Sequence, residues 1–166
     1  MENRWVLERL FGDTPLRKYP YSIVHYDSSD PRGIDVALAY RKDKMELLSA
    51  GKHHIIHKGK QLLTRDILRA EFLIENKKMA LLVNHHPSKY GGKSSSSRRS
   101  AALASLSALE DSLYNAGVSN MVITGDFNET PEKTHLNGQS GERIINLATP
   151  CLFKEKEPYD ITENGN

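Results

Sequence analysis

Asp126 and Asn128 stand two residues apart, directly after the apolar and β-branched run Met121 to Thr124. The run predicts a buried strand, and in extended backbone the side chains of residues i and i+2 project to the same side. We therefore expect a carboxylate and an amide together at a strand end, where α/β folds commonly place their chemistry. A carboxylate can bind a divalent cation or orient a water, and an amide can donate to a phosphate oxygen. The pair is typical of a site that hydrolyses phosphodiesters.

The turn from Gly125 to Asn128 also has a purely structural interpretation. An Asp-Phe-Asn sequence after a strand can form an Asx turn, in which the Asp side chain accepts a hydrogen bond from its own backbone. These four residues alone leave both interpretations open.

A second polar group follows the apolar run Met79 to Val83, where the sequence reads Asn-His-His-Pro-Ser. At a strand end, His85 could contact a phosphate or protonate a leaving oxygen. It could equally be satisfied by a neighbouring backbone carbonyl. His86 alternates to the opposite face, so we expect at most one of the two rings to face a given site.

Charged residues before two predicted strands have open roles. Arg65 could fork onto a phosphate, or it could form a structural ion pair with Asp66 or another carboxylate. Asp35 lies on the strand face away from the apolar row, and burial of that face would require a cationic partner. Arg32 and Arg65 are the expected candidates.

Three further histidines, His53, His54 and His57, are of a residue type that can bind metal ions. A spacing of four would bring His53 and His57 together on a helix. Because Ile55 and Ile56 favour a strand and the motif lacks its central Glu, we expect solvated strand residues there.

Length and composition limit the class of protein. The 166 residues, 38% hydrophobic and 27% charged, predict one globular domain over residues 1–166. No apolar run approaches the roughly 20 residues of a membrane span, and the amino terminus has no signal-peptide shape. Cys151 is the single cysteine, which excludes an internal disulfide and a thiolate metal cage. A net charge of +2 is too small to indicate nucleic-acid binding by itself, and a cytoplasmic or a secreted location both stay open.

The pattern of apolar residues predicts a mixed α/β layered fold. We expect a hairpin turn at 75–78 and a helix whose apolar face ends near Gly117, a C-cap. The predicted elements are a helix at 3–11, strands at 21–26, 34–41, 45–56, 67–74, 79–84 and 121–124, a helix carrying Ala102, Leu106, Leu109 and Leu113, a short helix at 142–147 and a polar tail at 154–166.

Residues 88–99 change the character of the chain, with two glycines, a run of serines and several basic side chains. We expect a mobile basic loop, with Ser96 or Ser97 capping the helix that follows. Such a loop could track a nucleic-acid backbone or be simply solvated. Tyr90 is its only aromatic residue, so stacking of single-stranded bases has little support.

Four motifs in order, residues 32–38, 84–88, 98–99 and 125–128, resemble the endonuclease/exonuclease/phosphatase superfamily. This group contains pancreatic deoxyribonuclease, apurinic endonucleases, sphingomyelinases and inositol phosphatases, and the chain is most similar to bacterial members. The resemblance covers roughly residues 1–131. It implies a deoxyribonuclease I-like α/β/β/α sandwich with mostly antiparallel sheets, which hydrolyses phosphate esters with Mg²⁺ or Mn²⁺.

The resemblance also implies roles for individual residues. Asp126 would orient or deprotonate the attacking water and contribute to the metal site. Asn128 would hold a phosphate oxygen, and His85 would contact the scissile phosphate and assist the leaving oxygen. The metal would act as a Lewis acid on the transition state. Residues expected to contact the substrate phosphate are Arg65, Lys89, Arg98 and Arg99.

The chain departs from the family pattern at both ends. Glu2 matches the second Glu of the family's Gln-Glu-(x)-Glu-Asn-like stretch, which puts the metal-binding Glu before Met1 and leaves out the first strand. The family's carboxy-terminal Asp-His pair has no match, because every histidine lies at or before His135 and Asp160 has no such motif around it. We therefore expect an incomplete sandwich.

Two functions follow from these observations. The first is a divalent-metal-dependent phosphodiesterase or phosphatase, whose substrate could be DNA, RNA, or a lipid or sugar phosphate. The second is a catalytically incomplete module that binds a phosphorylated partner through His85, Asn128, Arg65 and the basic loop. Missing strands would expose sheet edges, which predicts a homodimer or poor solubility.

Overall fold

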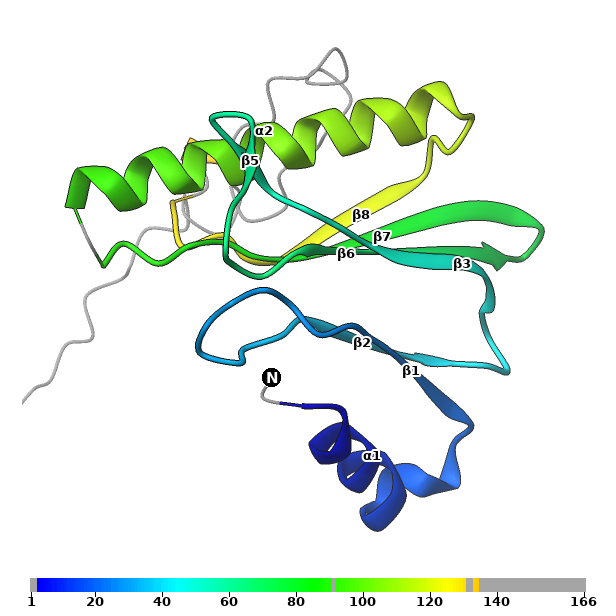
Figure 1. The fold of residues 1–166 in the computed structure, drawn as a ribbon. Helices are drawn as coiled ribbons and strands as arrows, with labels where there is room; N and C mark the ends of the chain where they lie inside the picture. The colour runs from blue at the N-terminus through cyan, green and yellow to red at the C-terminus, as the bar shows by residue number, and fades with distance from the viewer. Residues whose placement is uncertain (1–2, 91, 131–132, 135–166) are drawn as a thin grey trace, which may run out of the picture.

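The computed structural model describes residues 3–90, 92–130 and 133–134, and it has four layers (Figure 1). Helix α1 (Arg4–Asp13) lies outside a two-stranded antiparallel sheet of β1 (Tyr21–His25) and β2 (Ala37–Arg41). A four-stranded sheet faces β1 and β2, and helix α2 (Gly92–Asn115) covers its other side. The expected α/β/β/α layering is confirmed.

The four-stranded sheet has the order β3 (Glu46–His53), β6 (Ile67–Ile74), β7 (Lys77–His85) and β8 (Met121–Asp126). The turn between β6 and β7 falls within the predicted hairpin at 75–78. Strand β8 runs parallel to β7, because α2 forms the long crossover that a parallel pair requires. The remaining short elements are a 3₁₀ helix η1 (Pro15–Lys18) and the β4 (Ile56–His57) and β5 (Lys60–Gln61) hairpin.

Two hydrophobic layers hold these elements together. Between the sheets, the Phe72 ring packs edge-on against Tyr40, with centroids 4.9 Å apart. Between the large sheet and α2, the predicted helix face is buried as expected. The inner layer consists of Val24, Tyr40, Leu68, Ala70 and Phe72, and the outer layer includes Ile67, Ala80, Leu82, Ala102, Leu106, Leu109, Leu113 and Val118.

Helix α2 ends as predicted but begins earlier than predicted. Gly117 has φ +87°, and the amides of Gly117 and Val118 donate to the carbonyls of Tyr114 and Leu113, which makes a Schellman cap. The helix already begins at Gly92, so the expected loop at 88–99 and the cap at Ser96 or Ser97 are wrong for residues 92–99. Composition misled here, because the Ser95 hydroxyl is satisfied inside the helix by donating to the Gly92 carbonyl.

Two predicted strands have different limits in the structure. Strand β2 begins at Ala37 instead of residue 34. In the segment before it, the Asp35 side chain accepts a hydrogen bond from the Ser28 amide, which ties this segment to the loop. The predicted strand at 45–56 divides into β3 and β4, and β3 carries a bulge between Leu47 and Ser49. A period-two pattern marks extended backbone but does not show where pairing stops.

Several predictions fall outside the described residues. These are the helix at 142–147, the polar tail at 154–166, and the statements about Glu2, Cys151, His135 and Asp160. The single domain over residues 1–166 also stays a prediction. Within the described part, no helix has both the length and the hydrophobicity to cross a membrane.

Candidate functional site

His85 and Asp126 end two neighbouring parallel strands and lie opposite each other in the β7–β8 register. Their side chains reach the same place, with His85 Nε2 3.9 Å from Asp126 Oδ2. The Asp126 side chain is 62% exposed and the His85 side chain is 31% exposed, so a ligand from solvent can reach both. Because carboxyl ends of parallel strands meet at one sheet edge, residues 41 positions apart come together here.

Asn128 joins this pair through a turn, not through strand alternation. Strand β8 ends at Asp126, and Asn128 has φ +50°, so the expected extended geometry is wrong. The backbone N–H of Asn128 donates to Asp126 Oδ1 at 2.8 Å, and this hydrogen bond forms the Asx turn. Its side chain then donates from Nδ2 to the His86 carbonyl at 2.9 Å. The structural interpretation of the turn is therefore correct, and the same turn brings Asn128 to the His85 strand.

The protonation state of His85 is set by its surroundings. Burial and the nearby Arg65 guanidinium lower its pKa below the ordinary value, and Asp126 opposes this shift. The lowered pKa favours the neutral ring, which carries one N–H donor and one acceptor nitrogen. Neutral His85 can therefore donate a hydrogen bond to a phosphate oxygen without an added charge.

Arg65 lies beneath the strand end that carries His85, and it is only 2% exposed. Its Nη1 donates to Asp30 Oδ2 at 2.7 Å, while Nε and Nη2 donate to the His85 and His86 carbonyls. With its side chain buried and committed to these acceptors, Arg65 cannot reach a substrate phosphate. The expected phosphate contact is wrong, and the ion-pair alternative is confirmed, with Asp30 as the carboxylate.

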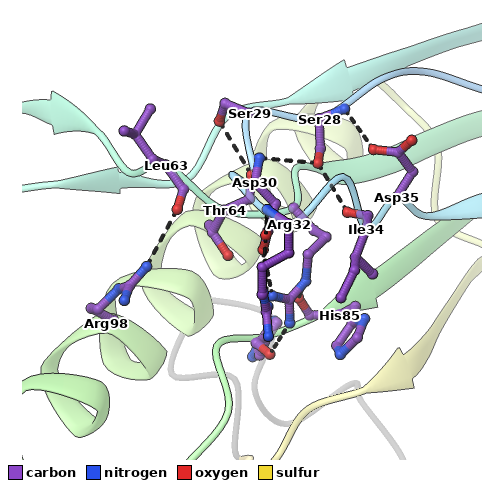
Figure 2. A network of polar contacts seen from close by, with 12 residues as sticks. Ser28, Ser29, Asp30, Arg32, Ile34, Asp35, Leu63, Thr64, His85 and Arg98 are labelled. Carbon is purple, nitrogen blue, oxygen red and sulfur yellow. Dashed lines mark hydrogen bonds and ion pairs between the residues drawn. The ribbon is translucent and has the colours of Figure 1, made fainter. Parts of the chain in front are cut away.

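Asp30 receives a second guanidinium, that of Arg32, and Figure 2 shows the resulting network beside His85. The Arg32 hydrogen bonds, together with that from Arg65, hold the pKa of Asp30 far below its usual range although burial opposes the shift. Both arginines expected to pair with Asp35 thus bind Asp30. The Asp35 carboxylate contacts other groups: its Oδ1 accepts from the Ser28 amide and its Oδ2 lies 3.2 Å from His25 Nε2.

The remaining basic residues divide into buried and exposed ones. Arg99 is buried and donates to Glu129, to the Ser88 carbonyl and to the Ser95 hydroxyl, so its expected phosphate contact is wrong. Lys89 is exposed and its Nζ lies 3.0 Å from Glu129 Oε1. Arg98 donates to the Leu63 carbonyl at the surface (Figure 2). Phosphate contacts by Lys89 and Arg98 stay predictions.

His86 points to the opposite face from His85, as predicted. It is 1% exposed, its ring packs edge-on against Phe127 at 5.0 Å, and neither ring nitrogen has a hydrogen-bond partner among the described residues. Burial lowers its pKa to about 4, with a further contribution from the Arg65 charge. His86 is therefore a neutral core residue.

A metal ion at Asp126 stays a prediction, and the residues around it show how far they fit one. Mg²⁺ is commonly held by one or two carboxylates together with waters and substrate phosphates. Asp126 brings one exposed carboxylate, and within the described ranges it belongs to no group of three potential ligands. The residues present thus fit one ligand of such a site. His53 and His57 lie on β3 and β4, as the strand interpretation predicted.

Three residues that contact the predicted site residues are not among the sequence predictions. The pairing of Asp30 with Arg65 spans 35 positions, for which the sequence carries no signal. Glu129 follows Asn128 directly and pairs with Lys89 and Arg99. His25 ends an alternating apolar segment in the same way as His85, and this is the signal that could have pointed to it.

Comparisons with solved structures place this fold among similar ones. The human Nocturnin catalytic domain with bound sulfate anion matches with TM-score 0.58 and 14% identity, over 84% of this chain and 49% of that one. D. rerio TDP2 complexed with single strand DNA product matches with TM-score 0.52 and 14% identity, over 82% and 50%. An endonuclease/exonuclease/phosphatase from Bacteroides vulgatus matches with TM-score 0.55 and 19% identity, over 84% and 54%.

The chain thus spans about half the length of these structures, and the likeness shows a common fold. None of the curated proteins matches the sequence. The model of the endonuclease/exonuclease/phosphatase family, in contrast, matches residues 1–144. This range contains the strands, the crossover helix and all three side chains of the His85, Asp126 and Asn128 cluster. The chain belongs to the endonuclease/exonuclease/phosphatase family.

Proposed function

We propose that this protein is a divalent-metal-dependent phosphoester hydrolase, whose substrate is a phosphodiester or a phosphomonoester. The observation that carries the proposal is the convergence of His85, Asp126 and Asn128 at one sheet edge, with His85 Nε2 3.9 Å from Asp126 Oδ2. Family membership supports the reaction class.

Each side chain has a defined task in this proposal. The Asp126 carboxylate orients the attacking water and accepts its proton, because its exposed oxygens face solvent and its position is held by the Asx turn. The neutral His85 ring donates to a phosphate oxygen and lies beside the leaving group. The backbone N–H of Asn128 holds the turn, and its side-chain amide holds a phosphate oxygen.

A bound Mg²⁺ or Mn²⁺ would supply Lewis-acid stabilisation of the developing negative charge. Asp126 is the described residue that would contribute to holding it.

Lys89 and Arg98 are the proposed contacts for the rest of the substrate. Lys89 is exposed near the loop that carries Asn128, and Tyr90 beside it is 97% exposed. Nucleic acid is one proposed substrate, since a protein of the same fold, D. rerio TDP2, was solved with a single strand DNA product. Removal of Lys89 should then weaken binding in a salt-dependent manner.

The test is hydrolysis of bis(p-nitrophenyl) phosphate and p-nitrophenyl phosphate by the wild type with Mg²⁺ or Mn²⁺. We expect Asp126→Asn and His85→Asn each to lower the rate by roughly 10²- to 10⁴-fold, because each removes a proton-transfer or phosphate-binding group. His57→Asn, which changes a histidine on β4, should keep the wild-type rate. Absence of metal-dependent turnover in a well-folded wild-type sample would overturn the proposal.

One observation favours a second candidate function, a catalytically incomplete module that binds a phosphorylated partner. In the described part of the chain, the cluster of His85, Asp126 and Asn128 contains one carboxylate, that of Asp126, and this carboxylate faces solvent. A binder should retain phosphate or short-oligonucleotide binding in chelator and tolerate Asp126→Asn, whereas the hydrolase needs both the metal and the carboxylate. Calorimetry in chelator separates the two.

A further inference from the structure

A second cluster of potential ligands lies on the smaller sheet, separate from Asp126. His25 ends β1, Asp27 follows two positions later, and Asp35 precedes β2. One ligand atom from each lies within 4.8 Å of the other two, and the group includes neither His85 nor Asp126. In the described part of the chain, it is the one place where three such side chains converge.

The His25 ring shows that the cluster is more than a hydrogen-bonded pair. Its side chain is 3% exposed, and Nε2 lies 3.2 Å from Asp35 Oδ2, well within hydrogen-bonding distance. Even so, Nε2 makes no aligned hydrogen bond to any described residue. The ring nitrogen and the carboxylate oxygen are therefore close but do not point at each other. An ion placed between them could use both atoms as ligands.

The separation also fits an ion. Two neighbouring ligands at about 2.1 Å from a tetrahedral or octahedral ion lie roughly 3.0–3.4 Å apart. The observed 3.2 Å falls in this range. A buried imidazole nitrogen without a partner otherwise costs free energy, and coordination would remove that cost.

The surroundings orient the acidic ligands and leave a path for the ion. The Ser28 amide donates to Asp35 Oδ1 at 2.8 Å, which leaves Oδ2 facing His25. Such a hydrogen bond is what orients carboxylate ligands in metal sites. Asp27 is exposed, so the cluster opens to solvent on its side. Lys52 is the nearby cation, and its ammonium donates to the Asp27 carbonyl at 2.7 Å.

We propose that His25, Asp27 and Asp35 form a binding site for a divalent transition-metal ion of the Zn²⁺ class. One imidazole nitrogen and two carboxylates suit Zn²⁺ better than Mg²⁺, which prefers an all-oxygen shell. The ion joins the end of β1 to the segment before β2, and this segment carries Asp30, which pairs with Arg65. Its role is to hold this loop in place, since an ion that binds the folded state stabilises it.

The test is calorimetric titration of the metal-stripped chain with Zn²⁺ in excess Mg²⁺, which saturates oxygen-only sites. We expect one Zn²⁺ to bind per chain and the thermal unfolding midpoint to rise. His25→Asn and Asp27→Asn should each weaken binding by about 100-fold or more, because each removes a direct ligand. Visible absorption of bound Co²⁺ should disappear in His25→Asn.

Two variants separate this site from other ligands in the chain. Asp126→Asn and the double variant His54→Asn/His57→Asn should both bind Zn²⁺ like the wild type. Asp27 is exposed, so Asp27→Asn gives a decisive result even where His25→Asn fails to fold. Undiminished Zn²⁺ binding by Asp27→Asn, or no binding by the wild type, overturns the proposal.

Discussion

At the scale of single residues, the buried guanidinium of Arg65 connects three parts of the candidate site. It binds Asp30 from the loop before β2 and the backbone carbonyls of His85 and His86. The His86 carbonyl also accepts a hydrogen bond from the Asn128 side chain. One buried cation therefore holds the strand end that carries His85 and anchors Asn128. A buried ion pair contributes little net stability when intact, but breaking it leaves an uncompensated charge.

Replacement of this cation should therefore be strongly destabilising. Arg65→Met leaves the Asp30 carboxylate buried, with the largely exposed Arg32 as its remaining arginine partner. We expect the free energy of unfolding to fall by about 3–5 kcal/mol in urea denaturation. Arg69→Met, which removes a half-buried pair with Glu71, should cost about 1 kcal/mol or less. Equal losses in the two variants would contradict the structural role of Arg65.

His86 predicts a pH dependence of stability, measured in chelator. Its pKa is about 4 in the folded protein against 6.5 in the unfolded chain, so the folded state binds this proton more weakly. The contribution is complete above pH 6.5 and is lost as the pH falls toward 4, by about 3 kcal/mol in total. His86→Phe should keep the ring contact with Phe127 and flatten this loss. An unchanged acid dependence in His86→Phe, with His57→Phe as control, would sink the assignment.

At the scale of elements, the site depends on the close approach of β7 and β8. Gly125 has φ +129°, and a Cβ atom there would lie 1.9 Å from the Asn84 carbonyl oxygen. Only glycine permits the two strands to pair at this position, directly beside Asp126. The parallel pair and the crossover helix α2 thus set the distance between His85 and Asp126.

Gly125→Ala should separate the strands or distort the turn. We expect a loss of about 3 kcal/mol or more in unfolding free energy, because a backbone clash adds to the strain of a positive φ. The matched control is Gly12→Ala in helix α1, where a Cβ would meet no atom within 4 Å. That substitution should raise stability by about 0.5–1 kcal/mol. A mild effect of Gly125→Ala in thermal denaturation would contradict the close approach.

At the scale of the whole molecule, the two edges of the large sheet differ. Strand β3 carries a bulge at Leu47 and Ser49, which interrupts regular pairing with a further strand. Strand β8 pairs with β7 on one side, and among the described strands none pairs with its other side. Val122 on β8 is 45% exposed. Unpaired, partly apolar edges favour pairing between copies of a chain.

We therefore predict concentration-dependent dimerisation through β8. Val122→Lys should shift the protein toward monomer in size-exclusion chromatography with light scattering, because a charged side chain opposes edge pairing. Leu48→Lys, at the bulged β3 edge and similarly exposed, should leave the dimer intact. A wild-type protein that stays monomeric at high concentration would remove the basis for this expectation.

Local patterns in the sequence account for most of the fold. The apolar spacing of α2, the cap at Gly117, the hairpin at 75–78 and the alternating strands could all be predicted, because each depends on neighbours within a few residues. Motif order also identified His85, Asp126 and Asn128, which the structure brings to one edge. The beginning of α2 could not be predicted, because its serines are satisfied by bonds that composition does not reveal.

The polar pairings were decided by the tertiary structure. Arg65 binds Asp30 and Asp35 lies against His25, where the sequence suggested a pair between Asp35 and an arginine. Arg99 turned inward to Glu129 instead of facing solvent. The sequence by itself determined which residues are apolar and which elements they form. Only the packing of one sheet on the other decided which charges meet, because hydrophobic burial sets that arrangement and buried charges must then pair with whatever lies within reach.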